Sequence, residues 1–177
     1  MENIGFNPDE NTDLQEEIPK RPVFLTVLIV LTSISIFFGL LGGVSSFMNG
    51  PLTEEQVEEG MMPLYETIPT LESEGLDNYA DMVRLIIDYT KHVNDNSFSL
   101  NNLLTILTYI IGIGAIVMMF RLRKIGFHLY VIYSLLPVVT LYLVAPSSLI
   151  PNIYVIFYMV IAILFTLLYA LNLKYMK

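Results

Sequence analysis

The sequence predicts an all-α membrane protein, a four-helix transmembrane bundle with an extracytoplasmic helical insert between its first and second spans. Hydrophobic residues make up 54% of the 177-residue chain and charged residues only 15%. Charges are nearly absent from four long apolar blocks, each about as long as the roughly 20 residues that a helix needs to cross a bilayer. Positive charges gather beside these blocks, which indicates how the chain is threaded.

The charge balance and the missing cysteine exclude several classes of protein. The net charge is −8, and the acidic residues fall in two stretches, 2–17 and 54–95. Neither stretch offers the basic surface that nucleic acid requires, so we expect no nucleic-acid partner. Because the chain contains no cysteine, it has neither disulfides nor a thiolate nucleophile.

The chain opens with a polar, acidic segment, residues 1–21, which is predicted to be a disordered cytoplasmic tail. Lys20 and Arg21 close it and anchor the first span, residues 22–48. Pro22 suits the first helical turn, where its missing N–H does no harm. The apolar run is longer than the core of a cleavable signal peptide, so an uncleaved transmembrane helix is predicted.

Small residues recur along one face of the first span. Ser35, Gly39 and Gly43 are four residues apart, which creates a strip where another helix can approach closely. The strip fits either a homodimer contact or packing inside the bundle. Packing inside the bundle is favoured because three other helices of the same chain are available.

The insert, residues 49–97, begins with a helix-start signal. Thr53 and Gln56 have the spacing of a capping box, in which each side chain bonds the other residue's backbone N–H. Pro63 and Pro69 interrupt the apolar pattern that follows. One or two short helices with a bend are therefore predicted.

The second half of the insert predicts an amphipathic helix. This helix has three alternative roles: it lies on the bilayer surface, it caps the bundle, or it presents its apolar face to a partner. Capping the bundle is favoured, because surface helices usually carry Lys and Arg on the polar face and here Asp predominates. The possible contact face consists of Tyr79, Met82, Val83, Ile86 and Ile87.

The rest of the chain predicts three further spans. Ser97 or Ser99 is the expected N-cap of the second span, Gly112 belongs to its small-residue stripe, and Pro137 is expected to bend the third span. Ala162 and Ala170 lie on a small-residue face of the fourth span. The predicted segments are the second span at 98–120, a basic cytoplasmic hinge at 121–125, the third span at 126–145, a short extracytoplasmic loop at 146–152, the fourth span at 153–173 and a cytoplasmic C-terminus at 174–177.

The cations predict that both termini are cytoplasmic, because Lys and Arg in short loops resist translocation. Four spans place seven of the nine cations on one side. Helical spans with a basic cytoplasmic side suit a bacterial inner (plasma) membrane. The residues that determine the topology are Lys20, Arg21, Arg121, Arg123, Lys124, Lys174 and Lys177.

The run Met118–Tyr130, read as MMFRLRKIGFHLY, resembles the connector between the second and third spans of small uncharacterised four-span bacterial membrane proteins. The resemblance covers about a dozen residues. It implies the four-span topology and no activity.

No motif predicts a catalytic, cofactor-binding or metal site. The spans carry no acidic or basic residue at mid-depth, where such groups usually mark transport or catalysis. HExxH and GxSxG sequences are also absent.

The leading functional hypothesis is a non-enzymatic protein that acts through helix–helix and extracytoplasmic contacts, as an assembly, accessory or regulatory subunit. Its expected partners are the lipid bilayer and either a second copy or another membrane protein. The alternative is a small transporter or channel with a hydroxyl-lined pathway. The hydroxyl-bearing candidates for that pathway are Thr26, Thr32, Ser35, Thr105, Thr108, Tyr109, Ser134, Thr140 and Thr166.

Overall fold

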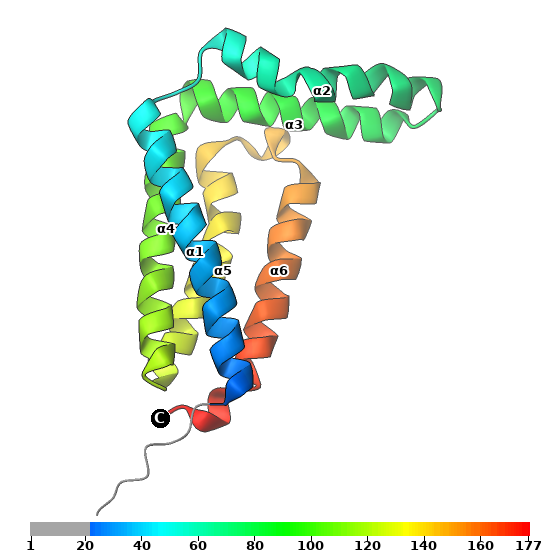
Figure 1. The fold of residues 1–177 in the computed structure, drawn as a ribbon. Helices are drawn as coiled ribbons and strands as arrows, with labels where there is room; N and C mark the ends of the chain where they lie inside the picture. Colours follow the sequence, from blue (N-terminus) through cyan, green and yellow to red (C-terminus); the bar gives the residue numbers. More distant parts are fainter. Residues whose placement is uncertain (1–21) are drawn as a thin grey trace, which may run out of the picture.

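The computed structural model describes residues 22–177, and every regular element in that range is helical. The elements are, in chain order, α1 (Val23–Asn49), α2 (Glu54–Ser73), α3 (Asp77–Asn96), α4 (Phe98–Phe120), α5 (Lys124–Val144), η2 (Ser147–Leu149), α6 (Asn152–Ala170) and η3 (Leu173–Tyr175). Helices α1, α4, α5 and α6 run lengthwise as a bundle, and α2 and α3 form a hairpin across one end of it (Figure 1).

Four of the described helices, α1, α4, α5 and α6, are long and apolar enough to cross a membrane. Their outward faces carry many exposed Leu, Ile, Val and Phe side chains. A helix satisfies its own backbone groups, and such side chains match hydrocarbon, as the interior of a bilayer demands. The prediction of an all-helical chain with four candidate spans is confirmed.

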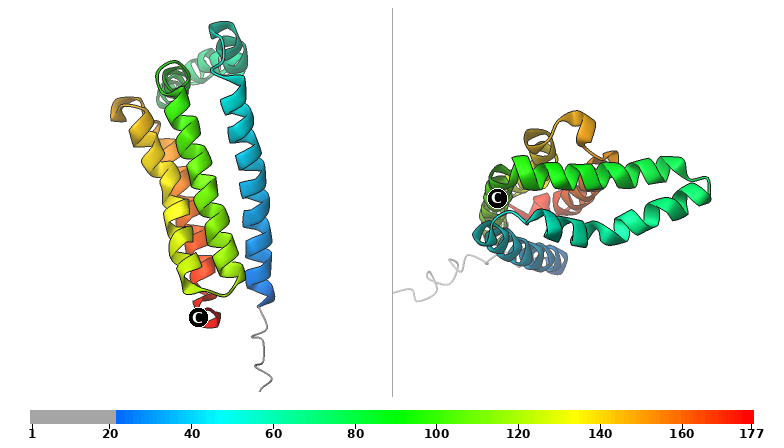
Figure 2. Two further views of the ribbon diagram at one scale, coloured as in Figure 1. Left: turned by 90° about the vertical axis from the view of Figure 1, so that its left-hand side faces the viewer. Right: turned by 90° about the horizontal axis from the view of Figure 1, so that it is seen from above.

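The long helices pack in the order α1, α4, α5, α6. The most extensive contact joins α4 to α5, while α1 packs on α4 and α6 packs on α5. The first and last members of this row, α1 and α6, contact each other far less. The four helices therefore form a curved row, and its two end helices do not pack together along their whole length (Figure 2).

Helices α4 and α5 approach each other closely at Gly126. A Cβ atom on Gly126 would lie 2.5 Å from the backbone nitrogen of Met119 and 2.9 Å from the carbonyl oxygen of Ala115. Both distances are too short for a real side chain. The turn between the two helices is tight as well, and Leu122 adopts a left-handed conformation there with φ 55°.

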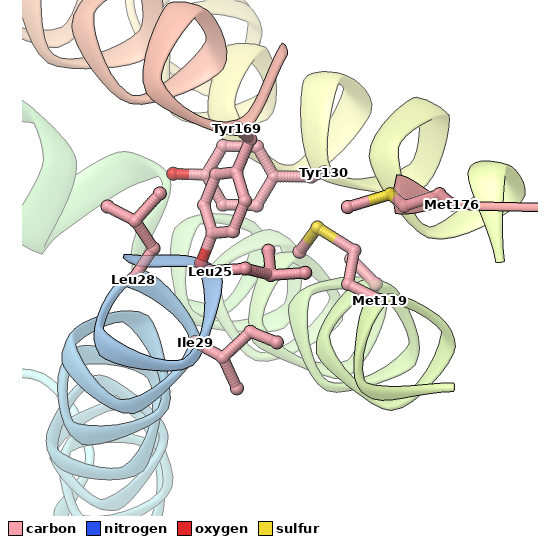
Figure 3. Packing of buried hydrophobic residues seen from close by; sticks show 8 residues of the cluster. Leu25, Leu28, Ile29, Met119, Tyr130, Tyr169 and Met176 are labelled. Carbon is pink, nitrogen blue, oxygen red and sulfur yellow. The ribbon is translucent and has the colours of Figure 1, made fainter. Parts of the chain in front are cut away.

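A buried cluster, here called the floor cluster, fills the end of the bundle opposite the hairpin (Figure 3). The Tyr130 and Tyr169 rings lie at its centre with their centroids 4.4 Å apart. The hydroxyls of Thr32 and Tyr169 lie 2.8 Å apart beside them and join α1 to α6. The floor cluster consists of Leu25, Leu28, Ile29, Ala115, Met119, Tyr130, Tyr169 and Met176.

The C-terminal segment is bonded to the turn between α4 and α5. The Lys177 backbone N–H donates to the Leu122 carbonyl at 2.7 Å, and the Lys177 carbonyl accepts from the Lys124 N–H at 2.9 Å. The basic residues of the turn and of the C-terminal segment therefore lie at the same end of the bundle, called here the hinge end.

Local features of the sequence explain where helix α2 begins and why its prolines do not end it. Thr53 and Gln56 form the predicted capping box, so that expectation is confirmed. The predicted interruption at Pro63 and Pro69 is wrong, because α2 is one helix of 20 residues. Each proline removes a backbone hydrogen bond, but both lie on the exposed side of α2, where water can satisfy the carbonyls that lose a partner.

The two helices of the hairpin share a buried apolar interface. Val57 of α2 is buried, as are Ala80, Val83 and Ile87 of α3, and the two helices are in extended contact. Ion pairs join the same helices at the surface: Arg84 pairs with Glu72, and Lys91 lies 3.9 Å from Glu58. Exposed pairs of this kind add little stability, so burial of the apolar residues holds the hairpin together.

A single residue, Ser97, separates α3 from α4. Ser97 occupies the N-cap position of α4, but its side chain makes no capping hydrogen bond, and Ser99 lies inside the helix. The predicted N-cap position is therefore confirmed for Ser97, but the capping hydrogen bond is absent. The hydrogen bond is absent because the ψ of Ser97, 13°, departs from the extended conformation in which an N-cap side chain reaches the helix N–H groups.

Candidate functional site

A cavity of about 410 Å³ lies inside the bundle. Its volume falls within the range of small-molecule sites, roughly 300–1,000 Å³. All four long helices and α3 contribute to its wall. The wall consists of Leu31, Thr32 and Ser35 from α1, Tyr89 from α3, Asn101, Thr105, Thr108 and Tyr109 from α4, Tyr130, Tyr133, Ser134, Pro137, Thr140 and Leu141 from α5, and Phe157, Tyr158, Ile161, Ala162 and Phe165 from α6.

The cavity wall is rich in hydroxyls and carries no charge. Eleven of its 19 residues are Ser, Thr or Tyr, and none is Asp, Glu, Lys, Arg or His. The remaining wall is mostly aliphatic or aromatic. Burial raises the pKa of the Tyr89 phenol to about 12, so this side chain is neutral at physiological pH.

The hydroxyls of the wall differ in their hydrogen bonding. Thr108 donates to the Leu104 carbonyl at 2.8 Å, and Ser134 donates to the Val131 carbonyl at 2.9 Å. Both oxygens keep lone pairs that can accept a bond from a ligand. Thr140 is only 8% exposed, and no hydrogen bond joins its hydroxyl to another group in the described part of the chain. Buried polar groups without partners are rare, so Thr140 is the prime position for a ligand hydrogen bond.

Pro137 adds a backbone acceptor on the same helix. It lies within α5 and lines the cavity. Because proline has no N–H, the carbonyl of Tyr133, four residues earlier, loses its helical partner. The Tyr133 carbonyl and the Thr140 hydroxyl are thus two polar groups available on one stretch of α5.

The floor cluster closes the cavity at the hinge end. Tyr130 and Thr32 belong to the cavity wall, and both are buried beside Tyr169. From Tyr130 to Leu141 the wall extends along α5 for roughly 16 Å at about 1.5 Å per residue. The buried side chains of the floor cluster, drawn in Figure 3, pack at this end of the cavity.

Helix α3 lies over the opposite end of the cavity. The Tyr89 ring packs edge-on against the Tyr154 ring, with the centroids 5.6 Å apart. Tyr89 also packs against a buried group formed by Leu141, Ala145 and Ile150. The C-terminal half of α3 therefore contacts the bundle, while the hairpin's far end projects beyond it (Figure 1).

The residues predicted as the contact face of α3 have different environments. Val83 and Ile87 are buried, Met82 and Ile86 are half-buried, and Tyr79 is 57% exposed. Tyr89, which contacts the bundle, was not among the residues predicted for this face.

Most of the nine hydroxyl-bearing candidates for a polar pathway line the same cavity. Seven of them, Thr32, Ser35, Thr105, Thr108, Tyr109, Ser134 and Thr140, line the cavity. Thr26 instead donates to the Pro22 carbonyl, and Thr166 is not part of the wall. Sequence reasoning missed Tyr130, Tyr133 and Tyr158 as cavity residues. The spacing of residues 130, 133, 134, 137, 140 and 141 along one face of α5 was the available signal.

The small residues predicted for helix packing differ in how closely they approach their neighbours. A Cβ on Gly39 would overlap the ring of Tyr109, and one on Gly112 would lie 2.8 Å from both Ile36 and Tyr133. Gly43 is in ordinary contact with Thr105 and Ile106 at 3.5 Å. Ser35 and Ala162 line the cavity. Ala170 is half-buried.

The predicted topology determinants Arg121, Arg123, Lys124, Lys174 and Lys177 are exposed and lie at the hinge end. Lys20 and Arg21 lie outside the described residues. Among residues 22–177, no group of three His, Cys, Asp or Glu residues has the arrangement of a metal site. Comparison with protein-family models, curated proteins and solved structures finds no match to this chain.

Proposed function

We propose that this chain is a non-enzymatic, four-span integral membrane protein that binds an uncharged ligand inside its helical bundle, as a small transporter does in one of its states. The observation that carries the proposal is the cavity of about 410 Å³ with a hydroxyl-rich, uncharged wall. It brings together most of the side chains expected of a polar pathway.

The absence of charged residues from the cavity wall indicates that the ligand is uncharged. A charged ligand inside an apolar bundle needs an opposite charge or metal to offset its desolvation, and the wall offers none. Hydroxyls can both donate and accept hydrogen bonds, so they suit a neutral ligand with its own hydroxyl or carbonyl. The same wall lacks the carboxylates and imidazoles on which acid–base catalysis usually depends.

The closed floor favours a binding cavity over an open channel. Tyr130, Tyr169 and Thr32 are buried at the hinge end, which supports a cavity that is closed at that end. A carrier that exposes its site to one side at a time has such a blind cavity. The proposal therefore specifies binding followed by a rearrangement, rather than free diffusion through a pore.

The orientation in the membrane forms part of the proposal. The exposed cations Arg121, Arg123, Lys124, Lys174 and Lys177 gather at the hinge end, which supports a cytoplasmic location for that end. The acidic hairpin at the opposite end is then extracytoplasmic. A bacterial inner membrane fits this arrangement of helical spans.

The test is native mass spectrometry of the protein purified in mild detergent. We expect a bound neutral molecule that survives in the Ile163→Phe variant, because Ile163 faces outward and is 52% exposed. We expect the molecule to be lost in Ala162→Phe, because the buried Ala162 lines the cavity. Equal occupancy in both variants, or only acidic or basic ligands, would contradict the proposal.

The projecting hairpin favours a second candidate function, action through contacts with a second copy or another membrane protein. Its outer part leaves Met62, Tyr65 and Tyr79 exposed by 52%, 37% and 57%. Light scattering of the purified protein tests self-association: a monomer in mild detergent, unchanged by Tyr79→Ser, would contradict a homo-oligomer built on this surface.

A further inference from the structure

We infer that the ligand enters the cavity sideways from the membrane, between α1 and α6, and that it is a neutral lipid with a hydroxyl headgroup. This inference rests on the proposed binding function and adds the route of entry and the chemical class of the ligand.

The first argument is that five residues of the cavity wall are exposed, all of them on α1 or α6; one is Tyr158 of α6, which is 37% exposed. Leu31 and Ser35 of α1 are exposed and line the cavity, as do Phe157 and Ile161 of α6. The exposed fractions of Leu31, Phe157 and Ile161 are 52%, 59% and 39%. The cavity therefore reaches the side of the bundle between these residues, which are called here the α1–α6 seam.

The order of helix packing explains why the opening lies at this position. Helices α1 and α6 are the two ends of the row α1, α4, α5, α6, and they contact each other little. The hydroxyls of Thr32 and Tyr169 join them near the hinge end. Beyond that bond the two helices separate toward the hairpin (Figure 1), and the α1–α6 seam lies in that stretch.

The second argument is that the ends of the cavity are covered. The floor cluster fills the hinge end. Tyr89 of α3, packed on Tyr154, covers part of the hairpin end. The seam, by contrast, is flanked by the outward apolar side chains of two candidate spans. A molecule dissolved in hydrocarbon meets this opening directly.

The third argument concerns the chemistry of the occupant. The rim of the seam offers Leu31, Phe157 and Ile161, which suit an acyl or alkyl chain. Deeper in the cavity lie Thr108, Ser134 and the unpaired hydroxyl of Thr140, which suit an alcohol headgroup. A phosphate or ammonium headgroup would find no opposite charge there. A long-chain alcohol or an acylglycerol has the required polarity along its length.

The probe is hexadecanol with a photoreactive diazirine in its alkyl chain, added to the full chain in proteoliposomes. We expect light-induced adducts on cavity-wall residues, including those of the α1–α6 seam, and competition by unlabelled hexadecanol. The matched probe, hexadecanoic acid with the same diazirine, should label the wall weakly when ionised. Thr140→Val should reduce labelling by hexadecanol about fivefold, the effect of one lost hydrogen bond, in protein that melts like the parent chain.

The route is tested separately with single cysteines, which are unambiguous because the chain has none of its own. We expect Ser35→Cys to react with a membrane-soluble maleimide and not with a charged, impermeant thiol reagent, and the attached maleimide to block probe labelling. Reaction with the impermeant reagent would overturn lateral entry and leave the binding cavity standing. Absence of any adduct on the wall, together with no ligand loss in Ala162→Phe, would overturn the binding function itself.

Discussion

The hydroxyl of Thr32 lies 2.8 Å from the hydroxyl of Tyr169, a contact that spans 137 positions in the sequence. It joins the first and last helices of the bundle, which otherwise contact little. Because the residues around it are buried, this contact closes the floor of the cavity and sets the point beyond which α1 and α6 separate.

Tyr169→Phe should lower the free energy of unfolding in detergent by roughly 0.6–1.7 kcal/mol, the range of hydrogen bonds measured between membrane helices. The ring remains to pack against Tyr130, so only the hydroxyl is lost. Thermal unfolding measures the effect, and Tyr142→Phe, on an exposed side chain, is the control. In a double-mutant cycle with Thr32→Val the two losses should not add; fully additive losses would mean that the hydroxyls are not coupled.

Gly126→Ala should destabilise the protein by about 1–3 kcal/mol, the usual cost of overpacking. The new methyl would meet the backbone of Met119 and Ala115, and backbone cannot turn aside as a flexible side chain does. Gly114→Ala is the matched control in the same pair of helices, because nothing lies within 4 Å of its Cβ position. If both variants melt at the same temperature, the close α4–α5 approach is wrong.

Gly39→Ala should also destabilise the protein, because the added Cβ meets the ring of Tyr109. The loss should be smaller than for Gly126→Ala, since the Tyr109 side chain can rotate away. Gly42, three residues along α1, has open space around its Cβ position, so Gly42→Ala should match the parent chain. A lower melting temperature for Gly39→Ala than for Gly42→Ala would assign the contact face of α1 to Gly39. If Gly42→Ala were the less stable variant, the orientation of α1 about its own axis would be wrong.

A reporter active only outside the cytoplasm should give no signal when fused after Lys177 and a strong signal when inserted at Gly75, in the turn of the hairpin. The expectation follows from the cations at the hinge end. Neutralising Arg121, Arg123 and Lys124 together should give mixed signals at both sites. A strong signal after Lys177 in the parent chain would refute the orientation.

Ile87→Asp should lower the stability of the isolated protein by several kcal/mol. Ile87 is 3% exposed, and an unpaired carboxylate in an apolar contact is costly. Tyr79→Asp, on an apolar residue of the same helix that is 57% exposed, should leave thermal unfolding unchanged. An equal loss from both substitutions would show that the whole predicted face of α3 is covered.

The helices could be predicted from sequence because their signals are local. Runs of apolar residues give the long helices, and Thr53 with Gln56 gives the start of α2. The same local reasoning failed at Pro63 and Pro69, where it counted the lost hydrogen bonds without knowing that they face water.

The cavity could not be predicted, because it depends on which helices are neighbours. Thr32, Thr108 and Thr140 were recognisable as polar groups in apolar runs, but each alone equally fits a hydroxyl bonded to its own helix. Only the order α1, α4, α5, α6 brings them round one space. Tyr130 illustrates the same limit: only the packing of α5 against α6 shows that it is buried beside Tyr169.

The packing of α1 on α4 rather than on α2 has a consequence for how the protein is made. Residues 50–97 are synthesised between these two helices, so α1 inserts into the membrane long before its partner leaves the ribosome. Helices α4, α5 and α6 follow one another with short connections and can pair as they emerge. The first helix must therefore remain without its partner, with Thr32 and Gly39 uncovered, until α4 has been synthesised.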